Sequence, residues 1–206
     1  MLKLWGRTNS INVQKVAWTL AELAIPHERI DAGIAFGKVG DPWFRAMNPN
    51  GLVPTIDDDG TVLWESNTIV RYLAAKYAPG KLIPTDPAAR AQAEMWMDWQ
   101  QNTVMPGLGP VFWGLIRTPA DKRDHEAIET GRKVAEAALL RLDAHLTDRT
   151  FIASDQLGVA DLSLGPVAYR WKSLPIERTP TPHLDTWYQR LVARPAFVQH
   201  VMLPVT

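Results

Sequence analysis

The spacing of apolar residues changes once along this 206-residue chain, at a stretch that holds three prolines and a glycine. Before residue 78, short segments with the alternation of strands take turns with segments of helical spacing, whereas only helical spacing follows residue 87. Residues 78–87 therefore predict a linker between two domains, residues 1–79 and residues 87–206. We expect a small domain that contains a sheet, followed by a larger helical one.

The first domain is expected to have the element order βαβαββα. Its predicted strands cover residues 2–5, 27–31, 53–57 and 62–64, and its predicted helices cover residues 13–23, 42–46 and, with Ser66 as the cap, 66–77. The first βαβ part needs a crossover and hence parallel strands, while Asp58-Asp59-Gly60 predicts an antiparallel hairpin. A mixed sheet covered by helices is typical of a thioredoxin-like fold.

The second domain is expected to be all helical, so that the whole chain is an α/β domain followed by an all-α domain. Its predicted helices cover residues 87–105, 121–146, 159–171, 182–194 and 195–202. Met105-Pro106-Gly107 is expected to interrupt or end the first of them, because proline removes a helical hydrogen bond. Residues 111–116 could then continue that helix after a break.

Charge and composition exclude several classes of function. Lysine plus arginine and aspartate plus glutamate number 22 each, without a basic stripe, so neither nucleic acid nor an anionic membrane is an expected partner. The absence of cysteine excludes a disulfide scaffold, a thiolate zinc site, an iron–sulfur cluster and a cysteine nucleophile. Any thiol chemistry must therefore use a thiol that a ligand supplies.

Neither a targeting segment nor a metal site is expected. The first residues lack the apolar core of a signal peptide, and residues 99–116, the longest uncharged run, hold too many polar residues, prolines and glycines for a membrane helix. The five histidines show no metal-ligand spacing, and residues 57–60 (DDDG) favour a hairpin turn over a calcium loop. We therefore expect a soluble, cytoplasmic protein without a metal.

A proline at the start of a predicted strand makes residues 48–56 (NPNGLVPTI) informative. Strands rarely absorb a proline. If the Val53-Pro54 bond were cis, the Val53 N–H and C=O would turn outward from the sheet edge and could pair with an extended peptide. The alternative is a plain turn that enters the strand.

The helix that follows begins with Trp64-Glu65-Ser66-Asn67. A helix N-terminus has free N–H groups and a partial positive charge, so it binds carboxylates well. With the Ser66 hydroxyl for a carboxylate and Glu65 for an ammonium group, the pair suits the end of an α-amino acid. The alternative is a helix cap beside a solvated acid.

The element order, the segments NPNGLVPTI and WESNTIVRYLA (residues 64–74) and the helical second half together resemble the cytosolic glutathione transferases, in particular bacterial serine-type members of theta, delta or nu character. The resemblance covers nearly the whole chain. It implies a cis Val53-Pro54 bond, pairing of the Val53 backbone with the cysteinyl part of glutathione, and binding of the γ-glutamyl part by Glu65 and Ser66. It also implies a homodimer that transfers its co-substrate glutathione to small hydrophobic electrophiles in detoxification.

A second family mark lies at Gly158 and Asp161, where the family usually has a hydroxyl residue followed at the third position by aspartate. Gly158 lacks the hydroxyl, which costs only a few tenths of a kcal/mol at a helix cap. We expect the Asp161 carboxylate to accept the Gly158 N–H and to serve folding, not catalysis.

The residue that activates the thiol is expected near the end of the first strand. The resemblance places Ser10 where serine-type transferases carry their hydroxyl, with Asn12 assisting and Thr8 as the rival. The lack of a tyrosine before Tyr72 excludes the tyrosine type. A hydroxyl and a helix N-terminus would stabilise a thiolate without acting as a base. The alternative, that Ser10 only caps the first helix, is compatible with this role.

The remaining expectations also follow from the resemblance. Lys38, with Asn50 second, is the candidate partner of the glycyl carboxylate, although Gly51 stands where several serine-type members have histidine. Asp98 is expected to reach across a dimer toward the glutamyl amine. Residues of the second half should form the electrophile pocket; the candidates are Phe112, Trp113 and Ile116.

Three other functions stay open from the sequence. The same fold and co-substrate could serve a glutathione-dependent isomerase, a dehalogenase or a peroxidase, although the Ser-Ser-Cys motif of the double-bond isomerases is absent. A disulfide reductase would have to use two glutathione molecules, since the chain has no cysteine. A non-catalytic binding module is the last alternative.

Overall fold

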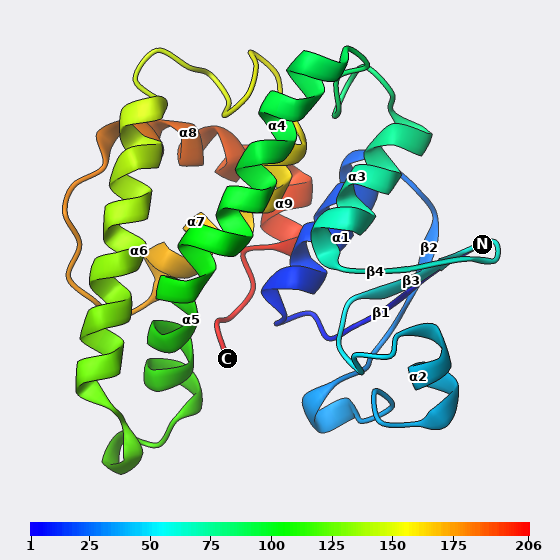
Figure 1. Cartoon of the computed structure of the whole chain (residues 1–206), viewed down its shortest axis with the longest axis horizontal. Helices are drawn as coiled ribbons and strands as arrows, with labels where there is room; N and C mark the ends of the chain where they lie inside the picture. The colour runs from blue at the N-terminus through cyan, green and yellow to red at the C-terminus, as the bar shows by residue number, and fades with distance from the viewer.

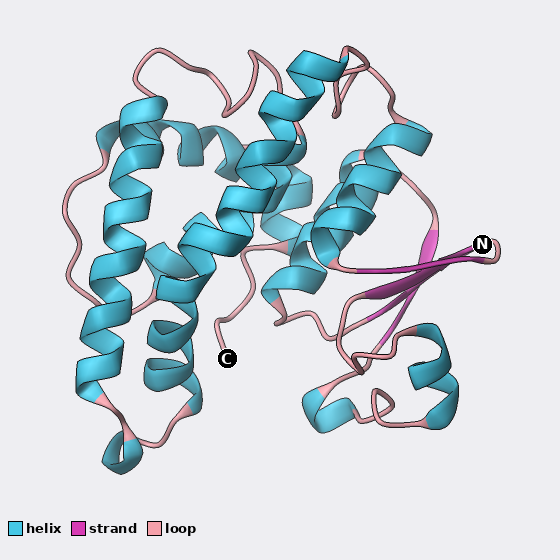
Figure 2. Ribbon diagram, in the orientation of Figure 1, coloured by secondary structure: helices cyan, strands magenta, loops and turns pink.

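The computed structural model describes residues 1–206 and shows a sheet-containing part followed by a helical part (Figures 1 and 2). The elements of the first part, in chain order, are β1 (Leu2–Trp5), α1 (Ile11–Glu22), β2 (His27–Ile30), a 3-10 turn (Ile34–Phe36), α2 (Pro42–Met47), β3 (Thr55–Asp58), β4 (Thr61–Trp64) and α3 (Ser66–Tyr77). The strand order is β2-β1-β3-β4, with β1 parallel to β2 and antiparallel to β3. The predicted thioredoxin-like βαβαββα fold is confirmed.

Helices cover both faces of this sheet, α1 and α3 on one side and α2 on the other (Figure 1). The alternation of β1 explains the arrangement: Leu2 and Leu4 belong to the main core with α1 and α3, while Trp5 packs with Phe44 of α2. Glycine is needed where β1 leads into α1, since a Cβ on Gly6 would lie 2.4 Å from a methyl of Val13. The start of α1 is thereby held close to the sheet edge.

The second part contains only helices, as predicted. Its elements are α4 (Pro87–Trp99), a π-type turn (Gln100–Val104), α5 (Met105–Phe112), a second π-type turn (Trp113–Arg117), a 3-10 turn (Ala120–Lys122), α6 (His125–His145), α7 (Val159–Ser173), α8 (Pro182–Val192) and α9 (Pro195–His200). The first part ends with α3 and the second begins with α4; one core of 42 buried residues spans both.

Met105-Pro106-Gly107 does not end the helix, which corrects our expectation. The helical path runs without a break from Pro87 to Arg117. Pro106 is the second residue after the π-type turn of residues 100–104. The wider turn provides room for the proline ring and tolerates the lost N–H. Residues 111–116 therefore belong to the same continuous helical segment as α4. We call this segment, residues 87–117, the helical rod.

Helix α5 approaches α6 very closely because glycines face each other. A Cβ on Gly107 would lie 2.5 Å from the backbone nitrogen of Ala135, and one on Gly131 would lie 2.7 Å from the Gly107 carbonyl oxygen. Figure 1 shows α5 lying alongside part of α6. This contact fixes the position of the helical rod that borders the candidate site.

Helix α7 lies at the centre of the second part. Asp161 accepts the Gly158 N–H at 2.9 Å, as predicted, and also accepts the Ile152 N–H and the Trp187 indole N–H. Burial raises the pKa of Asp161 to about 6, against the effect of these donors. Asp161 thus ties α7 to α8 and to the segment before it.

The C-terminal segment returns to the junction of the two parts. Figure 1 shows the C-terminus between them, and the Asn9 amide donates to the Thr206 hydroxyl at 2.8 Å. None of the helices combines the length and the apolar character that crossing a lipid bilayer requires. No cluster of three or more histidine, aspartate or glutamate side chains with metal-binding geometry is found.

Candidate functional site

The segment before β3 exposes an unpaired edge of backbone. The Val53-Pro54 bond is cis, as the resemblance implied. The Asn48 side chain is 2% exposed and holds the loop by donating to the Leu52 carbonyl at 2.9 Å and the Thr55 hydroxyl at 3.1 Å. The Val53 N–H and C=O have no hydrogen-bond partner within the chain. They are available to an extended ligand.

The N-terminus of α3 lies beside that of α1. The Ser66 hydroxyl donates to the Asn12 side-chain oxygen at 3.3 Å and so joins the two helices. The N–H groups of residues 66–68 in the first turn of α3 have no acceptor, and this turn holds no acid. Free donors and the helix dipole favour a negative group at this point.

Glu65, not Ser66, occupies the capping position of α3, which corrects the predicted cap. Glu65 has a φ of 69°, and its side chain makes no capping hydrogen bond. The left-handed backbone is uncommon for a residue other than glycine. It leaves the Glu65 carboxylate exposed next to the free N–H groups of α3.

Ser10 stands at the capping position of α1, and its hydroxyl makes no capping bond. The residue is 7% exposed. Ser10 and Asn12 both line a cavity of about 170 Å³ between the two parts. Two helix N-termini, one free hydroxyl and one amide thus meet at a single place, and all of these groups are uncharged.

The other predicted residues Thr8, Lys38, Asn50 and Asp98 do not line this cavity. Thr8 is exposed and lines a different cavity of about 280 Å³ with His27, Arg29 and His200. The Lys38 ammonium donates to the Asp31 carbonyl at 2.7 Å, and Asn50 is exposed and bonded to Asn48. Asp98 is exposed and forms an ion pair with Arg71.

The cavity at Ser10 has one apolar wall from the helical rod and several cations. Phe112 and Trp113, two of the candidates for the electrophile pocket, line it; the third, Ile116, does not line it and packs against the core instead. Sequence analysis missed three lining residues, Arg7, Arg117 and Arg170. Burial, with the charges of Arg117 and Arg7, lowers the pKa of Arg170 to about 10. Burial and the charge of Arg117 also lower the pKa of Arg7.

Sequence analysis also missed a buried lysine beneath α3. Lys15 is fully buried, and its ammonium donates to the Gln100 side chain at 2.7 Å and to the Asn67 side chain at 3.2 Å. Ser163 of α7 donates to the same Gln100 oxygen at 3.0 Å. Burial lowers the pKa of Lys15 to about 7, against the charge of Glu65. This network ties the N-terminus of α3 to the helical part.

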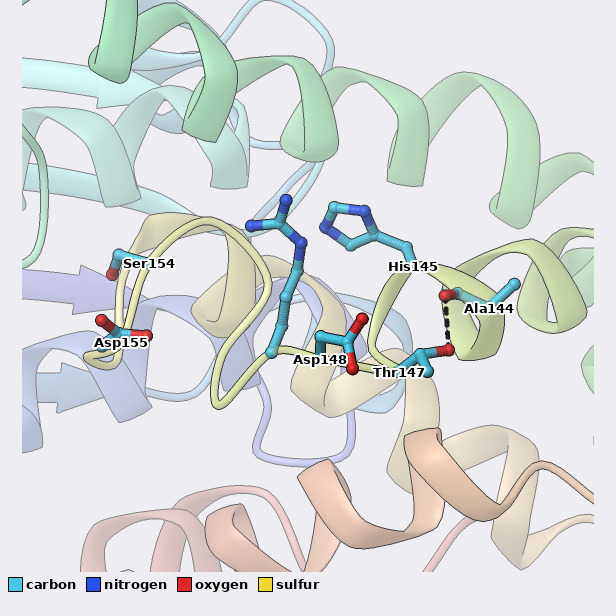
Figure 3. A pocket seen from close by; sticks show the side chains of 7 residues that line it. Ala144, His145, Thr147, Asp148, Ser154 and Asp155 are labelled. Atoms are coloured by element: carbon cyan, nitrogen blue, oxygen red, sulfur yellow. Dashed lines mark hydrogen bonds between the residues drawn. The ribbon is translucent and has the colours of Figure 1, made fainter.

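A wider hollow of about 600 Å³ lies on the helical part, at the end of α6 (Figure 3). Its lining is mostly polar and includes His145, Asp148, Ser154 and Asp155. The His145 ring nitrogen is already bonded to the Ile152 carbonyl at 2.8 Å. The hollow contains none of the residues that the sequence pointed to, so the cavity at Ser10 is the candidate site.

Comparison with known proteins gives a consistent result for both parts of the chain. The model of the glutathione S-transferase N-terminal domain matches residues 9–76, and that of the C-terminal domain matches residues 126–190. Glutathione S-transferase GstB of Escherichia coli K12 is 46% identical over 208 residues, covering 100% of both chains. Glutathione S-transferase 3 of Zea mays is 30% identical, covering 97% of this chain and 93% of the maize protein.

A solved structure is also similar. The theta class glutathione S-transferase of Xanthomonas axonopodis pv. citri, with glutathione bound, superposes with a TM-score of 0.96 at 43% identity. The superposition covers 100% of this chain and 99% of that protein. The likeness therefore extends through the sheet, the linker and all the helices.

Proposed function

Because this chain belongs to the glutathione S-transferase family, we propose that it binds glutathione beside Ser10, holds it as a thiolate and transfers it to small electrophiles. The observation that carries the proposal is the meeting of two helix N-termini at the Ser66–Asn12 hydrogen bond, next to the free Ser10 hydroxyl. These groups stabilise negative charge without competing for a proton.

Glutathione would lie along three features already described. The Val53 backbone would pair with the cysteinyl part, as one strand pairs with another. The first turn of α3 with Ser66 would take the glutamyl carboxylate, and Glu65 the glutamyl ammonium. Lys38 or Asn50 would take the glycyl carboxylate. The sulfur would then lie at Ser10, where the cavity opens.

The stabilisation of the thiolate expected at this site is sufficient for reaction near neutral pH. A free thiol has a pKa of about 8.5. A hydrogen bond to a charged group is worth about 1.5–3 kcal/mol, and a helix N-terminus adds about 0.3–1 kcal/mol. At about 1.4 kcal/mol per pKa unit, these effects lower the thiol pKa by about 1–3 units. A large share of the bound thiol is then thiolate, the reactive form.

The experiment that tests this function is retention on immobilised glutathione together with product analysis for 1-chloro-2,4-dinitrobenzene. In transfer, the sulfur forms a bond to the ring carbon, the carbon–chlorine bond breaks, and chloride leaves with the bonding pair. We expect retention and a stoichiometric conjugate. Failure to bind glutathione at millimolar concentration would contradict the proposal and favour a binding module.

The same product analysis separates the other reactions of this fold. An isomerase returns glutathione unchanged, a hydrolytic dehalogenase replaces the halogen with the oxygen of water, releases halide and returns glutathione, and a peroxidase or disulfide reductase yields oxidised glutathione. Consumption of one glutathione for each conjugate formed supports transfer, whereas any of the other three product patterns contradicts it.

We also propose that the protein is a homodimer that acts in the cytoplasm. Met95 and Val134 lie on α4 and α6 with about half of their surface exposed, 54% and 46%. Trp96, Trp99 and Arg141 form a shallow apolar hollow with Met95. A second copy that covered this face would bring a partner near Asp98. Sedimentation equilibrium tests the dimer, with a monomer at micromolar concentration as the contradicting result.

A further inference from the structure

Three arginines from distant parts of the chain converge on the candidate site. Arg7 follows β1, Arg117 ends the second π-type turn, and Arg170 lies on α7. All three line the cavity of about 170 Å³ that also exposes Ser10 and Asn12. No aspartate or glutamate lines this cavity. The proposed sulfur position therefore lies at a cavity whose lining carries three positive charges and no negative charge.

The arginines are held in place without acidic partners. None of them takes part in an ion pair within the chain, and the only side-chain hydrogen bond among them joins Arg170 to the Asn9 carbonyl at 3.0 Å. The guanidinium carbons of Arg170 and Arg117 lie 4.1 Å and 5.7 Å from the centre of the Phe112 ring. The Nε atom of each arginine is buried and has no partner.

Three arginines without acidic partners are electrostatically unfavourable unless a negatively charged ligand binds to them. Like charges that are partly removed from water repel one another, and guanidinium donors without acceptors lose hydrogen bonds to water. The lowered pKa values of Arg7 and Arg170 show the same effect. A structural role would normally bring a carboxylate from the chain itself, and none is present. Arginine forks match planar carboxylates well.

We propose that this cavity binds a carboxylate of the electrophile through Arg117 and Arg170, so that the enzyme prefers small, flat, anionic electrophiles. This inference rests on the proposed function, because it assigns the electrophile side of the same site. Phe112 lines the same cavity, and its ring lies against the guanidinium groups of Arg170 and Arg117. The reacting carbon of such a substrate would face the sulfur while its carboxylate lies among the guanidinium groups.

Arg7 borders both the cavity and the proposed glutathione position. Its terminal nitrogen lies 3.1 Å from where a Cβ on Gly33 would stand, next to the side chain of Val53. Arg7 could therefore also meet a carboxylate of glutathione. For this reason the test uses Arg117 and Arg170, which lie on the helical part.

A matched pair of electrophiles tests the proposal. In 4-chloro-3,5-dinitrobenzoate and 4-chloro-3,5-dinitrobenzamide the same carbon–chlorine bond is replaced by a carbon–sulfur bond, and chloride leaves with the electron pair. Only the benzoate carries the anion. After correction for the uncatalysed rates, we expect kcat/KM for the benzoate to exceed that for the benzamide by about tenfold, the value of one charged hydrogen bond.

The variants Arg117→Gln and Arg170→Lys locate the effect, with Arg90→Gln as the control because Arg90 lies on an exposed face of α4. Arg117→Gln should lower kcat/KM for the benzoate about tenfold and leave the benzamide and the KM for glutathione unchanged. Arg170→Lys keeps the charge but loses the planar fork, so its effect should be smaller. Arg90→Gln should change neither electrophile.

Two results would overturn the proposal. The first is an equal loss for benzoate and benzamide, and the second is a higher KM for glutathione with no change in electrophile preference, which would assign the arginines to glutathione. Calorimetric binding of 3,5-dinitrobenzoate against 3,5-dinitrobenzamide, with S-methylglutathione present, gives a readout that needs no turnover. Selective binding of 3,5-dinitrobenzoate, without conjugation of the chlorinated benzoate or benzamide, would contradict the proposed function but support this inference.

Discussion

The two sides of the candidate site use different groups for the same purpose. On the glutathione side, the sulfur and the glutamyl carboxylate would meet neutral donors: Ser10, Asn12, Ser66 and the first turns of α1 and α3. On the helical side, negative charge would meet the full charges of Arg117 and Arg170. The difference teaches that helix dipoles and hydroxyls suffice for the sulfur anion and the glutamyl carboxylate, while the carboxylate of an electrophile would be recognised by guanidinium forks.

The contrast also has a kinetic meaning. Groups that contact the sulfur should affect every substrate alike, because the thiolate is common to all transfers. Groups that contact the electrophile should affect only those substrates that carry the matching charge. The following predictions test this division, beginning with the largest effect.

Removal of the Ser10 hydroxyl should give the largest loss. We expect Ser10→Ala to lower kcat about 10²-fold, as for the loss of one donor to a developing anion, and to lower it equally for the benzoate and the benzamide. Steady-state kinetics with both chlorides measures this. Thr8→Ala is the matched control, since Thr8 lines another cavity, and it should keep full activity. A loss of activity with only one of the two electrophiles would contradict the assignment of Ser10 to the sulfur.

Glu65 should act on the binding of glutathione and not on the choice of electrophile. Glu65→Gln removes the negative charge proposed to meet the glutamyl ammonium, so we expect KM for glutathione to rise about tenfold with a small change in kcat. Glu28→Gln, at an exposed position of β2, serves as the control. A changed ratio of benzoate to benzamide in Glu65→Gln would contradict the assignment.

The close contact of α5 and α6 should matter for stability and for the cavity wall. A methyl group on Gly107 meets the backbone of Ala135, so Gly107→Ala should lower the free energy of unfolding by about 1–3 kcal/mol. Gly109→Ala is the contrasting variant, because nothing lies within 4 Å of its added Cβ. It should stabilise the helix by about 0.5–1 kcal/mol. Urea unfolding measures both, and equal effects would refute the packing argument.

The effect of the buried Lys15 should be visible only as a dependence of stability on pH. Its pKa of about 7 in the folded state lies below the ordinary value of 10.5, so between these values the unfolded chain binds more protons. The free energy of unfolding should therefore rise with pH above about 7, by at most about 1.4 kcal/mol per unit. Lys15→Met should show a smaller rise between pH 7 and pH 9. Parallel curves for the two proteins would contradict this.

The proposed glutathione side could be predicted from the sequence because its signals are local. The change of apolar periodicity coincides with the change from the sheet-containing part to the helical part, and Ser10, Asn12 and Ser66 each lie next to a helix start that the pattern predicts. Two local details were wrong for physical reasons. A wider turn absorbs Pro106 inside a helical rod, and a left-handed backbone puts Glu65 at the cap of α3.

The helical side could not be predicted in the same way. Arg7, Arg117 and Arg170 are separated by more than fifty residues each, and only the packing of α7 between the two parts brings them together. Arginines on amphipathic helices are usually solvated, so their sequence context carries no signal. Lys15 looked like an ordinary residue of α1 for the same reason, although it is fully buried and its ammonium is bonded to Asn67 and Gln100.

The ionisation of glutathione on the protein tests the central claim most directly. The ultraviolet absorbance of the thiolate, followed in a pH titration of the complex, gives the pKa of the bound thiol. We predict a value about 1–3 units below the 8.5 of a free thiol, with a return toward the free value in Ser10→Ala. A bound thiol that ionises at the same pH as free glutathione would contradict the account, since the meeting helix ends and Ser10 would then have no effect on the sulfur.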